Sequence, residues 1–377
     1  MAIGRILRVL ALEPYFGLSH KTFLEGYRSH SRHQVEIWSL PATKWKWRMR
    51  GGAWSFAETA RGTTSGEGFD VILASDFLNL PDWRALAPPG FRDLPVLVYF
   101  HENQITYPLG REAPVDFHYG WINASTALAA DRILFNSENH RRDFLAALGA
   151  VLRKMPDHIP ERLLESLPER SAVFPVGIDF RPHDLVRAPV PRSIPEAPVI
   201  FWNHRWEYDK GPDLFFETLI RLRNQGIPFR LVVCGQSFQA RPPVFDRARE
   251  ALADRIDHFG FFENTEGYLR AAAGADIVVS TAVNEFFGVS VIEAVYLGCL
   301  PVLPRRLSYP EIIPAHLHQE FLYADDRGFP AFLAGFLRDP PWGHREELHA
   351  AMGHFGWNLL APVLDRELEV LAERGHH

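Results

Sequence analysis

Two glutamates eight positions apart, Glu285 and Glu293, occupy the segment of this 377-residue chain with the most specific chemistry. The segment reads NEFFGVSVIEAVYLG, and its spacing predicts that Glu285 precedes a helix and that Glu293 lies two turns along it, with both carboxylates toward one side. A carboxylate in so apolar a helix is costly to bury unless it meets a hydroxyl or a cation. We therefore expect Glu293 to have such a partner; a solvent-facing glutamate is the alternative.

Arg205 and Lys210 form the second candidate group, in the segment NHRWEYDKGP. They follow a predicted strand and precede a helix whose first turn suits a proline. A guanidinium and an ammonium beside a helix N-terminus could clamp a diphosphate. The alternative is a pair of surface cations neutralised by Glu207 and Asp209.

Polar side chains also follow predicted strands in the first half of the chain. His101, Glu102 and Asn103 come directly after the run PVLVYF, where a histidine could exchange hydrogen bonds with a sugar hydroxyl. Gly17 and Ser19 stand between the first strand and a helix, with Ser19 expected as the N-cap. Free N–H groups there could face an anion, or the segment could be an ordinary turn.

The run KWKWRMR, residues 44–50, places four cations and two tryptophans in a chain with a formal charge of −6. Residues 1–66 carry +6, which leaves −12 for the remainder. Clustered cations attract phosphates, and tryptophans offer faces on which bases stack. The alternative is that the tryptophans pack against a sheet edge while the cations are solvated.

The composition, 47% hydrophobic and 23% charged, is that of an ordinary globular protein. Two cysteines within apolar runs, Cys234 and Cys299, argue against a disulfide framework or a thiolate zinc site and favour the cytoplasm. The apolar opening, residues 1–14, is too short to span a membrane and reads as a first strand. We expect no stable association with a membrane.

Short apolar runs that alternate with helical segments predict an α/β chain with parallel sheets. After a stretch rich in proline and charge, residues 181–198, the alternation of apolar runs and helical segments begins again. We therefore expect two doubly wound domains, residues 1–185 and 186–353, and a terminal helix within 354–377 that packs back toward the first domain. The predicted strands are residues 6–12, 35–40, 71–75, 95–100, 132–137, 172–176, 198–203, 229–235, 276–281 and 300–304.

The E-x7-E pattern, with Arg205 and Lys210 upstream and His101 in the first half, resembles the signature of retaining nucleotide-sugar glycosyltransferases of the GT-B fold. EPYFGLSHKTFLEG, KWKWRMRG, YFHENQITYP, HRWEYDKG and NEFFGVSVIEAVYLGCLPVLP together resemble the tRNA-queuosine mannosyltransferase family. The resemblance extends over essentially the whole chain. It implies two Rossmann-like domains facing across a cleft, an N-terminal one for the acceptor and a C-terminal one for the nucleotide sugar.

For the donor, the resemblance implies that Arg205 and Lys210 grip the diphosphate and that Glu293 binds the ribose. Glu285 would hold the sugar, and the turn at Gly17 and Ser19 would approach the phosphates. The backbone N–H groups that would help Glu285 are those of Phe286, Phe287 and Gly288. The first loop has one glycine where many relatives carry two, so this sequence departs from the pattern there.

The catalytic groups that the resemblance implies are His101, Glu285, Arg205 and Lys210. The expected acceptor and RNA-binding residues are Lys44, Trp45, Lys46, Trp47, Arg48, Arg50, His101, Glu102 and Asn103. The implied reaction moves mannose from GDP-mannose, used as a co-substrate with no cofactor, onto queuosine in the anticodon of a tRNA-Asp type tRNA. The chain lacks a D-x-D triplet, which favours metal-independent transfer.

There are three alternatives to this interpretation. Glu285 could act as a covalent nucleophile, but two carboxylates two helical turns apart, about 12 Å by rise, do not suit the pairing of retaining glycosidases. The same donor site could serve a polysaccharide or lipid-linked acceptor, with KWKWRMR at a membrane. The chain could also be a non-catalytic RNA-binding module on an old fold, against which the intact arginine, lysine and glutamate pattern argues.

Overall fold

The computed structural model describes residues 5–63, 68–107, 117–187, 195–237 and 242–374. The chain forms two compact units, unit 1 with residues 1–178 and 357–377, and unit 2 with residues 179–356. The first division thus precedes the predicted boundary at residue 185, and the second follows the predicted one at residue 353. Part of the expected linker, residues 188–194, lies outside the described residues.

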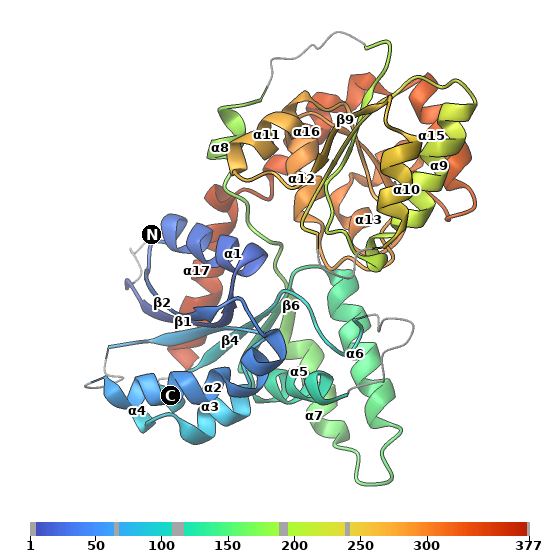
Figure 1. Cartoon of the computed structure of the whole chain (residues 1–377). Coiled ribbons are helices and arrows are strands. Elements are labelled where there is room, and N and C mark those ends of the chain that lie inside the picture. The colour runs from blue at the N-terminus through green and yellow to red at the C-terminus, as the bar shows by residue number, and fades with distance from the viewer. Residues whose placement is uncertain (1–4, 64–67, 108–116, 188–194, 238–241, 375–377) are drawn as a thin grey trace. The chain divides into compact units, whose positions relative to one another are not determined.

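Unit 1 is built on a six-stranded parallel sheet in the order β2-β1-β3-β4-β5-β6 (Figure 1). Its strands are β1 (Arg8–Phe16), β2 (Gln34–Pro41), β3 (Val71–Ser75), β4 (Val96–Phe100), β5 (Arg132–Phe135) and β6 (Ser171–Val173). The central strands β3 and β4 are buried along their whole length, as expected for a sheet covered on both faces. The strand order reverses between β1 and β3.

Helices cover both faces of this sheet (Figure 1). They are α1 (Leu18–His30), α2 (Trp45–Gly62), α3 (Leu80–Leu86), α4 (Pro89–Arg92), α5 (His118–Ala129), α6 (Glu138–Leu152), α7 (Glu161–Arg170) and α17 (Trp357–Arg374). Helix α17 packs against α1, as the terminal helix of unit 1. Its Trp357 is fully buried, and a Cβ added at Gly26 or Gly177 would lie within 2.3 Å of the indole. Only glycine therefore lets the chain approach this ring so closely.

Unit 2 repeats the plan with a parallel sheet in the order β12-β11-β10-β7-β8-β9. Its strands are β7 (Val199–Trp202), β8 (Arg230–Cys234), β9 (Ile256–Gly260), β10 (Ile277–Val279), β11 (Leu300–Pro304) and β12 (Leu322–Tyr323). Its helices are α8 (Arg181–Asp184), α9 (Pro212–Asn224), α10 (Val244–Ala251), α11 (Thr265–Gly274), α12 (Val289–Tyr296), α13 (Tyr309–Ile312), α14 (His318–Phe321), α15 (Phe329–Arg338) and α16 (Arg345–Gly353), with 3-10 turns η1 (Tyr208–Lys210), η2 (Ala315–Leu317) and η3 (Trp342–His344). The order reverses between β7 and β10.

The ten predicted strands all overlap observed ones, and the α/β class is confirmed. Sequence reasoning missed β9 and β12, which form the two edges of the second sheet. Strand β9 reads IDHFG and is only half-buried, and β12 has two residues. Neither presents the apolar run that marks a central strand.

Among the helices that the structure describes, none combines the length and the apolar run needed to cross a bilayer.

Candidate functional site

Unit 2 buries a charged cluster around Lys210 at its switch point, between β7 and β10. Gly211 has φ +62°, and a Cβ there would lie 2.2 Å from the carbonyl oxygen of Thr281, so this turn requires glycine. The turn directs Lys210 inward, where its Nζ donates to Asn284 O at 2.7 Å and lies 3.3 Å from Glu285 Oε2. Asp209 Oδ2 lies 3.2 Å from the same nitrogen. Lys210 is therefore a buried cation held by two carboxylates.

Arg205 lies in the same segment but is half-exposed. Its Nη2 lies 3.2 Å from Glu207 Oε2. The surface alternative named Glu207 and Asp209 as the partners of the two cations, and both pairs exist. It describes Arg205 well, but Lys210 is buried and also contacts Glu285.

Glu285 lies in the loop before α12, which begins only at Val289 after Gly288 with φ +103°. Glu285 thus precedes the helix, as expected, and the 12 Å estimate, which requires both glutamates to be helical, does not apply because the glycine turn separates them. Burial raises the pKa of the Glu285 carboxyl, but Lys210, His204 and the hydrogen bond from Phe287 N together outweigh it and lower the pKa below the ordinary value. Glu285 is thus an anion at neutral pH, with its Oε1 accepting from Phe287 N at 3.4 Å.

Glu293 lies on α12 and has the partners that the sequence required. Its Oε2 accepts a hydrogen bond from Tyr268 Oη at 3.0 Å, and its Oε1 lies 3.4 Å from His183 Nε2. Asn203 Nδ2 donates to Tyr268 Oη at 3.1 Å and to Ser290 O at 2.7 Å. The carboxylate is thereby oriented by a chain of hydrogen bonds that begins just after β7.

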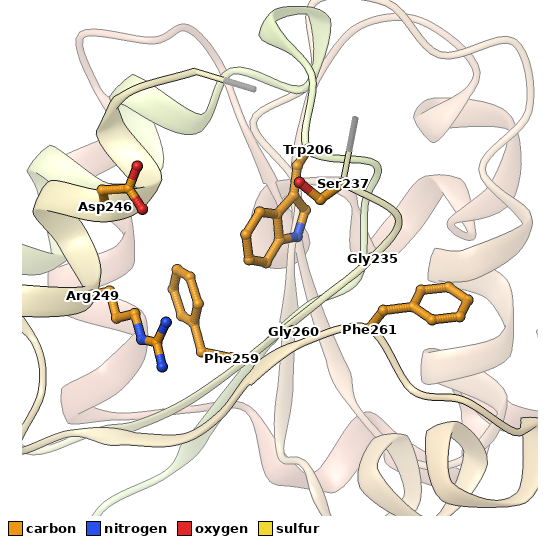
Figure 2. A pocket seen from close by; sticks show the side chains of 8 residues that line it. All are labelled: Trp206, Gly235, Ser237, Asp246, Arg249, Phe259, Gly260 and Phe261. Carbon is orange, nitrogen blue, oxygen red and sulfur yellow. The ribbon is translucent and has the colours of Figure 1, made fainter. Parts of the chain in front are cut away.

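A pocket of about 210 Å³ opens at the carboxyl ends of β8 and β9 in unit 2 (Figure 2). Trp206 and Phe259 form its apolar wall, while Asp246 and Arg249 project from α10. Phe261, just beyond β9, is 66% exposed. Ligands of open parallel sheets bind at this end of the strands, so an aromatic ring could lie here between flat faces and polar groups.

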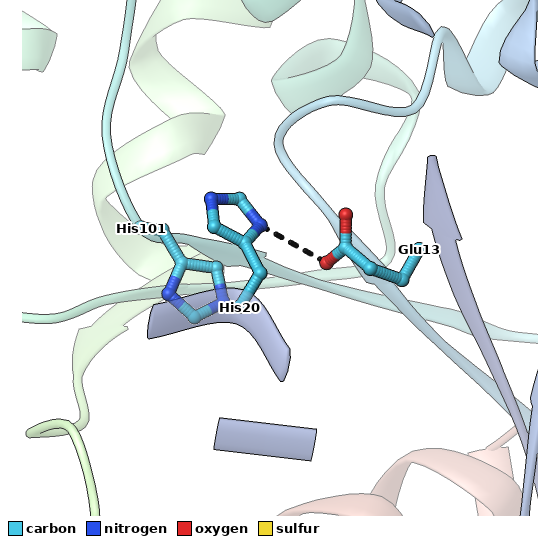
Figure 3. A group of neighbouring side chains, drawn as sticks. All are labelled: Glu13, His20 and His101. Atoms are coloured by element: carbon cyan, nitrogen blue, oxygen red, sulfur yellow. Dashed lines mark hydrogen bonds and ion pairs between the residues drawn. The ribbon is translucent and has the colours of Figure 1, made fainter. Parts of the chain in front are cut away.

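Unit 1 has its own buried polar cluster at its switch point, made of Glu13, His20 and His101 (Figure 3). Glu13 in β1 is fully buried, and its Oε1 accepts from Tyr15 N at 2.8 Å and Ser75 Oγ at 3.0 Å. Its Oε2 lies 3.0 Å from His20 Nδ1. The His20 ring stacks on the His101 ring, with centroids 4.0 Å apart and planes 29° apart.

Two neighbouring side chains hold the backbone of His101. Its N–H donates to Asp76 Oδ1 at 2.9 Å, and its carbonyl oxygen accepts from Asn136 Nδ2 at 2.8 Å. Burial, helped by the positive His20 and by His140, lowers the pKa of His101 well below its ordinary value. His101 is therefore a neutral ring, which suits hydrogen bonding to a hydroxyl.

The residues that follow His101 differ in their surroundings. Glu102 is half-buried, and its Oε1 accepts from Gln104 Nε2 at 2.9 Å. Asn103 is fully buried, and its Oδ1 accepts from the N–H groups of Ile105 and Thr106. Asn103 stabilises its own turn in this structure, which leaves its expected contact with RNA without support.

The turn before α1 differs from the expectation. Gly17, with φ −163°, is the N-cap and Ser19 lies in the first turn, because the helix begins at Leu18, two residues earlier than an N-cap at Ser19 would place it. Leu18 is strained, with φ +49°, and is 62% exposed. Whether this turn meets a phosphate stays a prediction.

The KWKWRMR run forms the start of α2, and its two tryptophans differ in their surroundings. Trp45 is half-buried against Tyr119, with ring centroids 4.9 Å apart, next to a buried cluster that contains Met49 and Phe77. Trp47 is 52% exposed and meets Trp54 edge to face. Trp45 is therefore packed within unit 1, whereas about half of the Trp47 indole stays exposed beside Trp54.

Cations surround this helix start. Lys46 Nζ lies 5.5 Å from the centre of the Tyr119 ring and the Arg50 guanidinium 5.2 Å from it. Arg48 Nε donates to Pro41 O at 3.0 Å. Lys44, Lys46 and Arg50 are exposed. The helix start thus presents positive charge beside an exposed indole.

Sequence reasoning missed several residues of both clusters. Glu13 and His20 stand in the segment that was singled out for Gly17 and Ser19, and a glutamate at the end of an apolar strand was the available signal. Tyr268 and His183 had no such signal, because each lies in an ordinary amphipathic or loop segment. Their proximity to Glu293 comes only from the fold.

Comparisons with known proteins bear on both units. Residues 8–178 match the family model described as tRNA-queuosine alpha-mannosyltransferase N-terminal, and residues 189–327 match that of glycosyl transferases group 1. A tRNA-queuosine alpha-mannosyltransferase of Drosophila melanogaster is 36% identical over 341 residues, which cover 88% of this chain and 87% of the relative.

Solved structures share the fold at low identity. Sucrose-phosphate synthase from Thermosynechococcus elongatus is 14% identical with a TM-score of 0.71, over 98% of this chain and 100% of the other. A glycosyltransferase from Rickettsia africae is 15% identical with a TM-score of 0.66, over 97% and 98%. The expected GT-B fold is confirmed.

Proposed function

We propose that this chain, which belongs to the tRNA-queuosine alpha-mannosyltransferase family, takes its mannose from GDP-mannose and adds it to queuosine in the anticodon of a tRNA-Asp type tRNA. The observation that carries this function is the 36% identity to a curated enzyme over 88% of the chain. The two family models together span the charged clusters of both units. The chain is accordingly a glycosyltransferase that acts on tRNA.

The donor diphosphate is proposed to bind beside Arg205 and Lys210. Arg205 is half-exposed, and exposed ion pairs contribute only about 0–1 kcal/mol, so exchange of Glu207 for a diphosphate costs little. Lys210 is already held by Glu285 and Asp209. Its proposed contribution is therefore to offset these two carboxylates, so that they repel the departing phosphate less as negative charge develops on it.

Two carboxylates are proposed to bind the rest of the donor. Glu285, ionised beside Lys210, can accept hydrogen bonds from sugar hydroxyls. Glu293, oriented by Tyr268, can do the same for the ribose. The pocket beyond β8 and β9 offers aromatic faces to the base.

The proposed transfer retains the configuration at the sugar and needs no metal or cofactor. The bond from the sugar carbon to the phosphate oxygen breaks, and the queuosine hydroxyl oxygen bonds to the same face. The hydroxyl proton passes to the phosphate oxygen. Neutral His101 is proposed to contact the sugar, because a cationic ring would oppose the positive charge that develops on it.

The acceptor RNA is proposed to lie on the start of α2. Trp47 provides a stacking face, and Lys44, Lys46 and Arg50 provide phosphate contacts. We also propose a cytoplasmic location, supported by Cys234 and Cys299, which are buried and not joined in a disulfide.

Transfer is tested with the purified chain, queuosine-containing tRNA and a panel of nucleotide sugars. Mass spectrometry of the digested nucleosides should show one added hexose, fastest with GDP-mannose. Transcripts without queuosine serve as the control and should gain nothing. Hexose addition from no donor in the panel would refute the function, and a faster reaction with a uridine donor would refute the donor assignment.

A further inference from the structure

His20 is a buried histidine to which the proposed transfer gives no role, although it lies directly on His101. It comes from the first turn of α1, whereas His101 follows β4. The two rings are 4.0 Å apart at their centroids, and Figure 3 shows Glu13 on the far edge of the His20 ring. The contact joins a residue with a proposed role in transfer to one without any.

A metal centre is the first alternative for two histidines and a glutamate, because ligand atoms of all three lie within 4.8 Å of one another. A metal bound to both rings must lie in the plane of each, about 2 Å from each nitrogen. Planes only 29° apart, from rings stacked at 4.0 Å, meet much farther away than that. In addition, Nδ1 of His20 already faces Glu13 at 3.0 Å. The geometry is that of a stacked pair and not of metal ligands.

The charge on the pair is set by several groups around it. Burial by itself lowers the pKa of His20, but Glu13, with smaller contributions from Asp76 and Glu102, outweighs burial and raises it to about 9. The pKa of His101 is lowered by burial, by His20 and by His140. The titratable groups that face the pair are Glu13 from β1, Asp76 after β3, Tyr99 and Glu102 at the end of β4, and His140 from α6.

We propose that His20 is a positioning residue for glycosyl transfer, whose imidazolium, anchored on Glu13, stacks on His101 and holds that ring in place as a neutral hydrogen-bonding group. This inference rests on the proposed function. A cation on one ring of the stack makes a second cation on the other unfavourable at this distance. His101 can then face a sugar on which positive charge develops without adding to that charge.

Glu13→Gln removes the charge and keeps the shape. The amide oxygen can still accept from Tyr15 and Ser75, and the amide N–H group can donate to a neutral His20 ring. With the carboxylate gone, burial dominates and the pKa of His20 should fall below its ordinary 6.5. His20→Gln is the complementary variant, which removes the ring itself.

The free protein provides the first test, which does not depend on activity. Imidazole NMR with ¹⁵N-labelled histidine should show His20 titrating near pH 9 and His101 neutral throughout. In Glu13→Gln, the His20 midpoint should move below 6.5. A neutral His20 at pH 7 in the unaltered protein would overturn the proposal.

The second test follows mannose transfer to queuosine tRNA by the full chain. The kcat of the unaltered enzyme should fall as the pH rises through about 9, and in Glu13→Gln that limb should move below pH 7. At pH 7.5 both variants should lose roughly 10- to 100-fold in kcat, with KM for the nucleotide sugar within about twofold. Unchanged kcat and pH limb in folded variants would overturn the proposal.

His33→Gln is the matched control, because His33 is also buried in unit 1 and accepts from Leu7 N at 3.2 Å. This variant should leave the pH at which kcat falls unchanged, even if Tm falls. Loss of activity on chelation, with recovery on added zinc, would overturn the proposal in favour of a metal centre. If the unaltered chain transfers no mannose, the proposed function fails, while the NMR titration still tests the stack.

Discussion

The two units place buried charge at the same point of their sheets, where the strand order reverses, but they use different cations. In unit 2 the cation is Lys210, between Asp209 and Glu285. In unit 1 it is His20, on Glu13. A histidine whose pKa is about 9 loses its charge within the range of ordinary experiments, so the cation of the unit 1 cluster is one that alkaline pH removes.

The largest effect is expected from Lys210→Ala in unit 2. It leaves Glu285 and Asp209 buried without their cation, which should lower the free energy of unfolding by about 3–5 kcal/mol. Transfer should fall by at least about 10³-fold, because two uncompensated carboxylates would then oppose the negative charge on the departing phosphate. Urea unfolding and nucleoside mass spectrometry measure the two effects.

A double variant separates stability from catalysis at Lys210. Lys210→Met with Glu285→Gln removes the charges of that pair and leaves only Asp209 without its cation, so part of the stability should return while transfer stays low. Lys154→Ala, on an exposed residue, is the control and should change stability by less than about 0.5 kcal/mol. Wild-type turnover in Lys210→Ala would contradict the role given to unit 2.

The pH dependence of stability should have opposite signs in the two units. The raised pKa of His20, about 9 against 6.5, stabilises unit 1 fully below pH 6.5, and this contribution disappears as the pH rises to 9. The size is roughly 3 kcal/mol. His20→Gln should therefore destabilise the protein at pH 6 and much less at pH 9.5.

His204 in unit 2 gives the opposite dependence. Burial, with the nearby Lys210, lowers the pKa of His204 to about 4. The unfolded chain then binds the proton first, so unit 2 loses stability as the pH falls from 6.5 toward 4, again by roughly 3 kcal/mol. His204→Gln should flatten this acid limb in urea titrations; an unchanged limb would show that another group causes it.

A smaller effect should distinguish the exposed surface of unit 1 from the donor site of unit 2. Trp47→Ala removes an exposed indole, so tRNA binding should weaken by about 1–3 kcal/mol while unfolding stays within about 0.5 kcal/mol. Filter binding at several salt concentrations measures it. Trp47→Phe keeps a stacking face and should bind within about threefold, and equal binding by Trp47→Ala would exclude stacking there.

The smallest effect is expected from Tyr268→Phe in unit 2. It removes the hydrogen bond to Glu293, which should weaken GDP binding by about tenfold in calorimetry. Phe332→Leu, on a half-buried aromatic residue of α15, is the control and should leave GDP binding unchanged. Unaltered affinity in Tyr268→Phe would mean that Glu293 does not need this orientation.

Local pattern determined much of the fold and part of the candidate site. Apolar runs identified ten strands, because central parallel strands are buried on both faces. The edge strand β9 was missed because it is only half-buried and therefore lacks such a run. The rule that ligands lie beyond strand ends pointed to His101, Lys210 and Glu285. His101 follows its strand directly, and Lys210 and Glu285 lie in the loops that follow theirs, so no long-range information was needed.

Only the tertiary structure decided which groups meet. Glu13, His20 and His101 come from three different elements or their ends, and the meeting of these groups depends on how β1, α1 and β4 pack. The sequence alone could not tell Trp45 from Trp47, which are two residues apart, because the exposure of a side chain depends on what the rest of the chain places against it. The charge of the His20 and His101 rings also depends on the tertiary structure, because burial and nearby charges, both products of packing, set the pKa of each ring.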